Sequence, residues 1–157
     1  MNKTISSIVL VLMMVLSAGG AYAHCEVPCG IYDDEMRFDM IAEHITTIEK
    51  SMTMIVDLSK APEENYNQLV RWVNNKEEHA EQIQDIVYQY FMTQRVKPVG
   101  DEKGEMYEKY LKQLTLLHHM LVYAMKAKQT ADLNNVETLR ELLEAFRNVY
   151  FGEGHKH

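Results

Sequence analysis

The chain has 157 residues, with 16 Lys plus Arg against 23 Asp plus Glu, two cysteines and 46% apolar residues. This length suits one domain whose core is large enough to fold without disulfides, and the long apolar periodicities exclude a disordered chain. The net charge of −7 argues against nucleic-acid binding, because contacts with phosphates depend on clustered Lys and Arg.

Residues 1–23 are predicted to form a secretory signal peptide. Fifteen of them are apolar, Lys3 carries the only charge, and the run IVLVLMMVL leads to a small-x-small pattern at residues 21–23. A transmembrane anchor is the alternative, but this run is too short to cross about 30 Å of hydrocarbon. We therefore expect signal peptidase to cleave between Ala23 and His24, and the mature chain to be periplasmic or secreted without a membrane anchor.

Four helical patterns follow one another in the mature domain, residues 24–157. Apolar residues recur every three or four positions in each pattern, which is the spacing of one helix face. The four stripes are Ile41, Ile45, Ile48, Met52 and Ile55; Leu69, Trp72, His79, Ile83, Ile86 and Tyr90; Tyr110, Leu114, Leu117, Leu121 and Ala124; and Leu139, Leu142, Phe146 and Val149. Strand-like alternation is absent, so the sequence predicts an all-α fold, a four-helix bundle.

Local signals place the ends of these helices. Pro62 suits the first turn of the second helix, and residues 97–100 with Gly104 mark the clearest break. Asn134 with Glu137 predicts a capping box that opens the fourth helix.

Both cysteines lie in the nine-residue segment 24–32, His-Cys-Glu-Val-Pro-Cys-Gly-Ile-Tyr. A disulfide between Cys25 and Cys29 is one interpretation, because exported proteins meet an oxidising compartment. Two idle thiols in an unstructured tail are a second interpretation. A thiol redox protein is a third and weaker one, since the spacing is not that of a Cys-x-x-Cys motif.

Signal-peptide cleavage would create a chelating geometry in the same segment. The His24 amine and the Cys25 amide nitrogen close one five-membered ring on a metal, and that nitrogen with the Cys25 thiolate closes a second. Pro28 and Gly30 bracket a turn that brings the Cys29 thiolate to the fourth position, while the His24 imidazole reaches an axial one. Planar nitrogen and sulfur donors indicate Ni(II) or Cu(II) rather than tetrahedral zinc. Thiolates tend to reduce Cu(II), which favours nickel.

The pattern His-Cys-x-x-Pro-Cys-Gly-x-Tyr directly after a signal-peptide site resembles the nickel hook of nickel superoxide dismutases. The motif covers nine residues, and the rest of the chain agrees in architecture, since that family is built from four-helix bundles assembled as a homohexamer. The resemblance implies an antioxidant oxidoreductase that disproportionates superoxide, with one nickel ion per subunit held by His24, Cys25 and Cys29. It also implies that Pro28 sets the turn of the hook and that Tyr32 lines the approach of the substrate.

The ligand types explain why this chemistry is accessible to nickel. Dismutation needs a metal that superoxide alternately reduces and oxidises, and two thiolates with a deprotonated amide stabilise Ni(III). The axial His24 imidazole favours the trivalent state further, and the Tyr32 phenol can orient superoxide or an ordered water, so we assign both residues catalytic roles. A packing tyrosine at the start of the first helix is the alternative for Tyr32. An exported nickel sensor or chaperone with the same hook is the alternative function.

In the family, a Glu from the first helix and an Arg from the second hold the axial imidazole, and such partners orient a ligand His. Here His79 falls where the Arg is expected, and the carboxylate is Asp39 or Glu43. Solvated charges and a hydrogen-bonded core histidine are the alternatives for these three residues. His44 has no partner at i+4 on its own helix. No Glu-x-x-His occurs in the chain, which excludes di-iron bundle chemistry.

Overall fold

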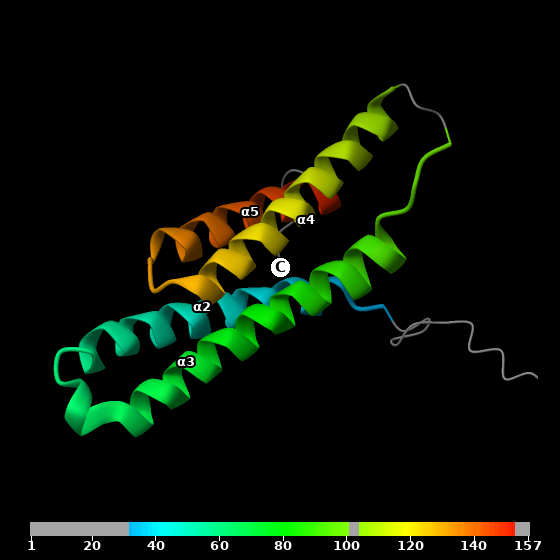
Figure 1. The fold of residues 1–157 in the computed structure, drawn as a ribbon. Coiled ribbons are helices and arrows are strands. Elements are labelled where there is room, and N and C mark those ends of the chain that lie inside the picture. The colour runs from blue at the N-terminus through cyan, green and yellow to red at the C-terminus, as the bar shows by residue number, and fades with distance from the viewer. Residues whose placement is uncertain (1–31, 101–103, 153–157) are drawn as a thin grey trace, which may run out of the picture. The chain divides into compact units, whose positions relative to one another are not determined.

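The computed structural model describes residues 32–100 and 104–152, and all regular elements in these ranges are helical. Helix α2 spans Asp34–Leu58, α3 spans Pro62–Asp85, and α3 continues directly into the π-helix η1, Ile86–Arg95. Helix α4 spans Glu105–Gln129 and α5 spans Asn134–Phe151 (Figure 1). The prediction of an all-α fold is confirmed.

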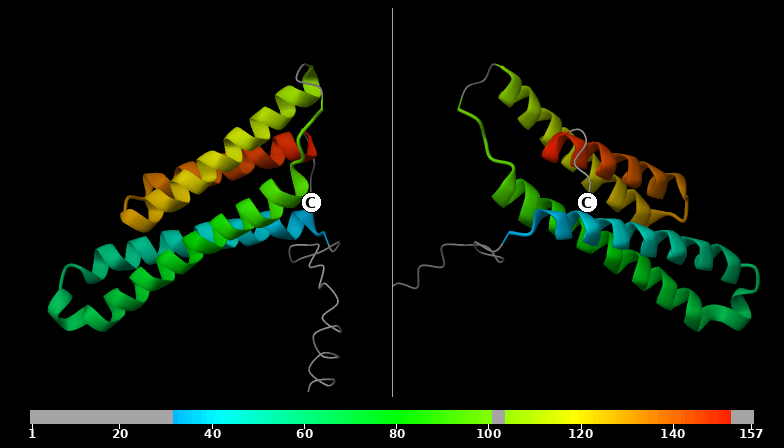
Figure 2. Two further views of the ribbon diagram at one scale, coloured as in Figure 1. Left: turned by 45° about the vertical axis from the view of Figure 1, so that its right-hand side comes forward. Right: turned by 180° about the vertical axis from the view of Figure 1, so that it is seen from behind.

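The helices form an up-down-up-down bundle in which each helix has two neighbours. Helix α2 packs against α3 and α5, and α4 packs against α3 and α5. All the views in Figures 1 and 2 show the α4–α5 pair crossing the α2–α3 pair at an angle, so that the turn between α2 and α3 extends beyond α4 and α5. The predicted four-helix bundle is therefore confirmed, with one end of the α2–α3 hairpin uncovered.

The apolar spacing of α2 explains its packing. Ile41, Ile45, Ile48 and Met52 are fully buried, as the steps of four and three residues predict for one helix face. At the start of the same helix, Phe38 joins an aromatic cluster whose other members are Phe91, Phe146, Tyr150 and Phe151. This cluster ties the beginning of α2 to η1 and to the end of α5, which fixes the end of the bundle that follows the hook in sequence.

The helix ends agree with two of the three local signals. Pro62 is the first residue of α3, and no helix is assigned between Val96 and Gly104 among the residues described there. The predicted capping box is wrong, because Leu133 is the N-cap residue of α5 and its side chain makes no capping hydrogen bond. The Asp132 carboxylate instead accepts a hydrogen bond from the backbone N–H of Asn134 at 3.0 Å, which satisfies one of the free N–H groups of the first turn.

The π-helix η1 changes the helical phase within the α3–η1 rod. The Val96 N–H donates to the carbonyl of Phe91 at 2.7 Å, and the Thr93 hydroxyl donates to the carbonyl of Tyr88 at 2.6 Å. Both hydrogen bonds reach back five residues, as in a π-helix. Side chains five positions apart therefore come close to the same face at this end of the rod.

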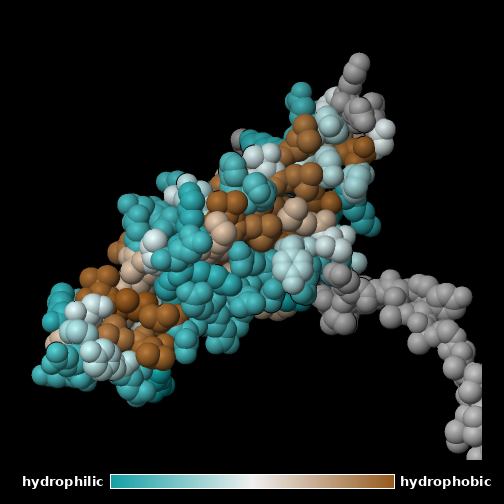
Figure 3. All heavy atoms as spheres, in the orientation of Figure 1, coloured by the Kyte–Doolittle hydropathy of each residue, from teal (hydrophilic) through white to brown (hydrophobic). Residues whose placement is uncertain are grey.

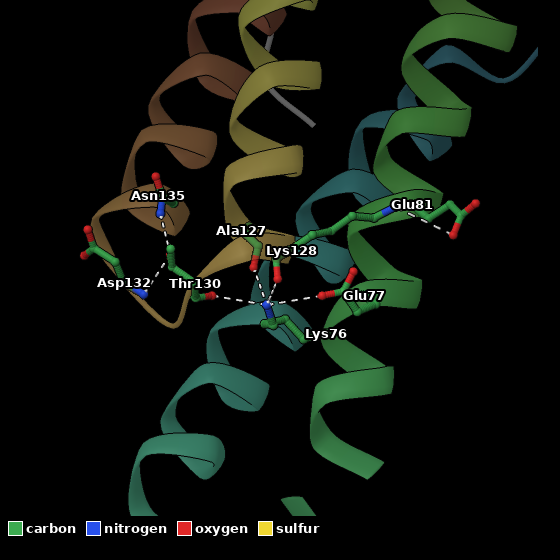
Figure 4. A network of polar contacts seen from close by, with 8 residues as sticks. All are labelled: Lys76, Glu77, Glu81, Ala127, Lys128, Thr130, Asp132 and Asn135. Carbon is green, nitrogen blue, oxygen red and sulfur yellow. Dashed lines mark hydrogen bonds and ion pairs between the residues drawn. The ribbon is translucent and has the colours of Figure 1, made fainter. Parts of the chain in front are cut away.

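A buried lysine joins the two hairpins. Lys76 of α3 is 4% exposed, and its ammonium donates to the carbonyls of Ala127 at 2.7 Å, Thr130 at 3.2 Å and Lys128 (Figure 4). The carboxylate of Glu77 lies 3.5 Å away. A cation at the C-terminus of α4 meets the negative end of the helix dipole and carbonyls that have no partner within the helix.

Apolar side chains also gather outside the core, at the uncovered end of the α2–α3 hairpin (Figure 3). The hairpin patch consists of Val56, Tyr66, Val70 and Val73, which are between 39% and 62% exposed.

A search of the described helices for a membrane-spanning segment found none, since each is too short or too polar to span a bilayer.

Candidate functional site

Tyr32, the last residue of the predicted hook, lies two positions before helix α2. The Arg95 guanidinium stands over its ring, with Cζ 4.4 Å from the ring centroid, and the Tyr90 ring meets it edge to face at 6.1 Å. Tyr32 is 47% exposed. Two residues of η1, Tyr90 and Arg95, therefore contact the ring of Tyr32, while about half of the residue stays accessible to solvent.

The side chain that organises this end of the bundle is Asp34, the first residue of α2. Arg95 donates from Nε to Oδ1 at 2.8 Å and from Nη2 to Oδ2 at 2.6 Å. The Tyr90 hydroxyl donates to Oδ1 at 2.5 Å and the Tyr150 hydroxyl to Oδ2 at 2.8 Å. Each carboxylate oxygen thus accepts two hydrogen bonds from side chains of η1 and α5. We call Asp34, Tyr90, Arg95 and Tyr150 the Asp34 cluster.

The charges of the Asp34 cluster follow from these contacts. Burial raises the pKa of Asp34, but the hydrogen bonds from Arg95, Tyr90 and Tyr150 outweigh burial, and the pKa lies below its usual value. Burial and the hydrogen bond to Asp34 raise the pKa of Tyr150 to about 12 and also raise that of Tyr90. At neutral pH the cluster therefore holds one carboxylate, one guanidinium and two neutral phenols.

His79 forms a pair with His44 across helices α2 and α3. Their Nδ1 atoms are 2.9 Å apart, so one imidazole donates and the other accepts. Burial and the neighbouring His79 lower the pKa of His44, while Glu43 opposes this effect. This pair was not visible in the sequence, because its two members lie on different helices and are 35 residues apart.

The two carboxylates considered as partners of the axial ligand lie at the surface. The side chain of Asp39 is 64% exposed and forms an ion pair with Arg147 of α5 at 3.1 Å. Glu43 is also exposed. The roles assigned to Asp39, Glu43 and His79 as partners of the His24 imidazole stay predictions, since His24 lies outside the described residues.

The other hook residues, namely His24, Cys25, Pro28, Cys29 and Gly30, also precede the described part of the chain. Within residues 32–100 and 104–152, no three His, Cys, Asp or Glu side chains form a group that could hold a metal ion. The proposed ligands therefore stay predictions. Of the hook segment, the structure describes only Tyr32, together with its contacts to Tyr90 and Arg95.

A sequence model of the nickel-containing superoxide dismutases matches residues 20–154, which is most of the chain. The chain belongs to this family. Membership in the nickel-containing superoxide dismutase family makes the protein an oxidoreductase that dismutates superoxide, and it implies nickel as the metal. Searches of curated proteins and of solved structures gave no match. The family resemblance found in the hook motif is thus confirmed over a stretch that also includes all four helices.

Proposed function

We propose that the segment 24–32 of the processed chain is the nickel site of this dismutase, with one nickel ion per subunit. The ligands are the amine and imidazole of His24, the amide nitrogen and thiolate of Cys25, and the thiolate of Cys29. The chemistry of this donor set supports the proposal, because nitrogen and thiolate donors in a plane suit nickel better than zinc. The observation that carries it is the match to the family across residues 20–154, together with the complete hook motif.

Nickel in such a site supplies a one-electron couple, so that one superoxide is oxidised to dioxygen and a second is reduced to hydrogen peroxide with two protons. The chain's own contribution includes Tyr32, which is half exposed and lies two positions before Asp34, the first residue of α2. Its phenol can donate a hydrogen bond to an anion or an ordered water. Pro28 and Gly30, on either side of Cys29, would set the turn that brings the Cys29 thiolate to the metal.

The proposal requires processing. Residues 1–23 act as the signal peptide, signal peptidase releases the amine of His24, and the mature domain 24–157 works in the periplasm or outside the cell. Cleavage and metal binding are linked, because an amide nitrogen at position 24 would be a much poorer donor than a free amine.

We further propose that the protein assembles as a homohexamer and that the hairpin patch takes part in subunit contacts. Val56, Tyr66, Val70 and Val73 lie on the end of the α2–α3 hairpin that α4 and α5 leave uncovered. Contiguous exposed apolar surface of this kind marks interaction sites. Sedimentation of the mature protein tests the assembly, and Val70→Lys should lower its mass towards that of smaller species if the patch is part of an interface.

The test of the function is to purify the mature protein, identify its N-terminal residue, and measure bound nickel and superoxide consumption in the same sample. We expect His24 first, about one nickel per chain, and rapid dismutation. A matched control is the chain that retains Ala23, which should bind nickel poorly and lack activity. Full activity with Ala23 attached would refute the ligand set. Stoichiometric nickel without any turnover would favour a sensor or chaperone.

A further inference from the structure

We infer that Asp34 is a positioning residue for this dismutase: its carboxylate, acting through Arg95 and Tyr90, fixes the ring of Tyr32 and the point where the hook joins the bundle. The inference rests on the proposed role of the hook and of Tyr32. It assigns a function to the Asp34 cluster that neither the hook motif nor the family match contains.

The hydrogen bonds of Asp34 restrict its partners in direction as well as distance. The contact of Arg95 is bidentate, which fixes the plane of the guanidinium, and the Asp34 and Arg95 side chains are only 17% and 29% exposed. The fixed guanidinium is the group that stands over Tyr32 at 4.4 Å. A cation over an aromatic ring is favourable, so the orientation imposed by Asp34 is passed on to Tyr32.

Tyr90 provides a second route from the same carboxylate. Its hydroxyl is bound to Oδ1 of Asp34 and its ring packs edge to face against Tyr32. The guanidinium of Arg37 also lies over the Tyr90 ring, with Cζ 5.0 Å from the ring centroid. Tyr32 is thus positioned by two side chains, and both of them bind the same carboxylate.

Tyr32 and the proposed ligand Cys29 are close together along the chain, so fixing one limits the position of the other. Cys29 precedes Tyr32 by three residues, so their Cα atoms are at most about 11 Å apart even in an extended chain. Fixing Tyr32 therefore restricts the volume that the C-terminal ligand of the hook can occupy. Misplacement by about 1 Å can lower a catalysed rate by roughly a hundredfold, which makes such restriction relevant to turnover.

Another carboxylate–arginine pair, Glu49 of α2 with Arg140 of α5, provides a matched comparison. Glu49 binds Arg140 of α5, but their side chains are 42% and 38% exposed. Among residues 32–100 and 104–152, no tyrosine donates to this pair, and Glu49 lies fifteen residues further along α2 than Asp34. Asp34→Asn and Glu49→Gln each remove one negative charge with almost no change in volume. Only the first acts on Tyr32.

The experiment compares these two variants in the full mature protein labelled with 3-fluorotyrosine. The fluorine resonance of Tyr32, assigned with Tyr32→Phe, is recorded without metal, and nickel content and dismutation are measured after loading. For Asp34→Asn we expect a shifted or broadened Tyr32 resonance, unchanged nickel content, and a rate constant for superoxide lowered roughly ten- to a hundredfold. For Glu49→Gln we expect the wild-type resonance and the wild-type rate constant.

Asp34→Asn can also destabilise the fold, because it leaves Arg95 without its charge partner. Arg95→Lys keeps the positive charge beside Asp34 but removes the planar group over Tyr32, and it should also shift the Tyr32 resonance and lower the rate. An unchanged Tyr32 resonance in Arg95→Lys and in folded Asp34→Asn would overturn the inference, and so would a shifted resonance with wild-type turnover. If the wild-type protein bound nickel without turnover, the proposed function would fail, while the resonances without metal would still test the positioning.

Discussion

Replacing Lys76 with Met tests how much one buried ammonium stabilises the packing of α3 against the end of α4. Methionine keeps most of the apolar stem but removes the three hydrogen bonds to the carbonyls of Ala127, Lys128 and Thr130. A hydrogen bond to a charged group contributes about 1.5–3 kcal/mol, and a buried carbonyl left without a partner costs about 1–3 kcal/mol.

Two opposing effects reduce the sum of these values. Desolvating an ammonium costs several kcal/mol, and only Ala127 of the three acceptor residues is buried, so water can replace Lys76 at the other two carbonyls. We therefore expect Lys76→Met to lower the free energy of unfolding by about 3 kcal/mol. For a domain of this size that corresponds to a Tm lower by about 10 °C.

Urea unfolding of the protein without metal, followed by circular dichroism, measures this loss. Lys60→Met is the matched control, since the Lys60 side chain is 74% exposed and forms only a surface ion pair with Asp57; its effect should stay below about 0.5 kcal/mol. A loss below about 0.5 kcal/mol for Lys76→Met as well would refute the reasoning. The hydrogen bonds at the end of α4 would then only balance the free energy that desolvating the ammonium costs.

Three further predictions concern the hook and the histidine pair. Cys25→Ser and Cys29→Ser should each abolish dismutation while circular dichroism stays helical, and loss of folding would instead favour a structural disulfide. His24→Ala keeps the N-terminal amine, the Cys25 amide nitrogen and both thiolates, so nickel analysis should find near-stoichiometric metal while turnover falls by orders of magnitude; wild-type turnover would contradict the role of the imidazole. Because the folded protein lowers the pKa of His44 below its usual 6.5, the unfolded chain binds a proton more readily, and stability should fall as the pH drops below about 6.5. Unfolding midpoints from pH 7.5 to 5 should show this slope, and His44→Gln should reduce it; an equal slope in the variant would assign the effect to other groups.

The sequence was sufficient for the helices because their signals are local. The spacing of Ile41, Ile45, Ile48 and Met52 predicts one buried face, and each of these residues is fully buried. Pro62 likewise predicts its own place in the first turn of a helix. The capping box at Asn134 failed because Asn134 is the first residue of the helix rather than its N-cap, and the Asp132 carboxylate accepts the hydrogen bond from its N–H group.

The surroundings of Tyr32 could not be predicted in the same way. Asp34 meets Tyr90, Arg95 and Tyr150 across separations of 56, 61 and 116 residues. No periodicity relates positions so far apart, and each of these side chains taken alone is consistent with a solvated or packing role. These four side chains come together only because η1 and α5 pack beside the start of α2.

The π-helical turns of η1 make this end of the protein sensitive to chain length. Tyr90 and Arg95 are five positions apart, which in a regular α-helix would separate their directions by about 140°. Hydrogen bonds that reach back five residues bring both side chains to the same carboxylate. With the same number of residues wound as a regular α-helix, the guanidinium would point away from Asp34, even though every residue type in the cluster would be preserved. With one residue fewer between them, α-helical winding would place the two side chains only about 40° apart and return them to one face. For this part of the chain, the count of residues is as much a determinant of the site as their identity.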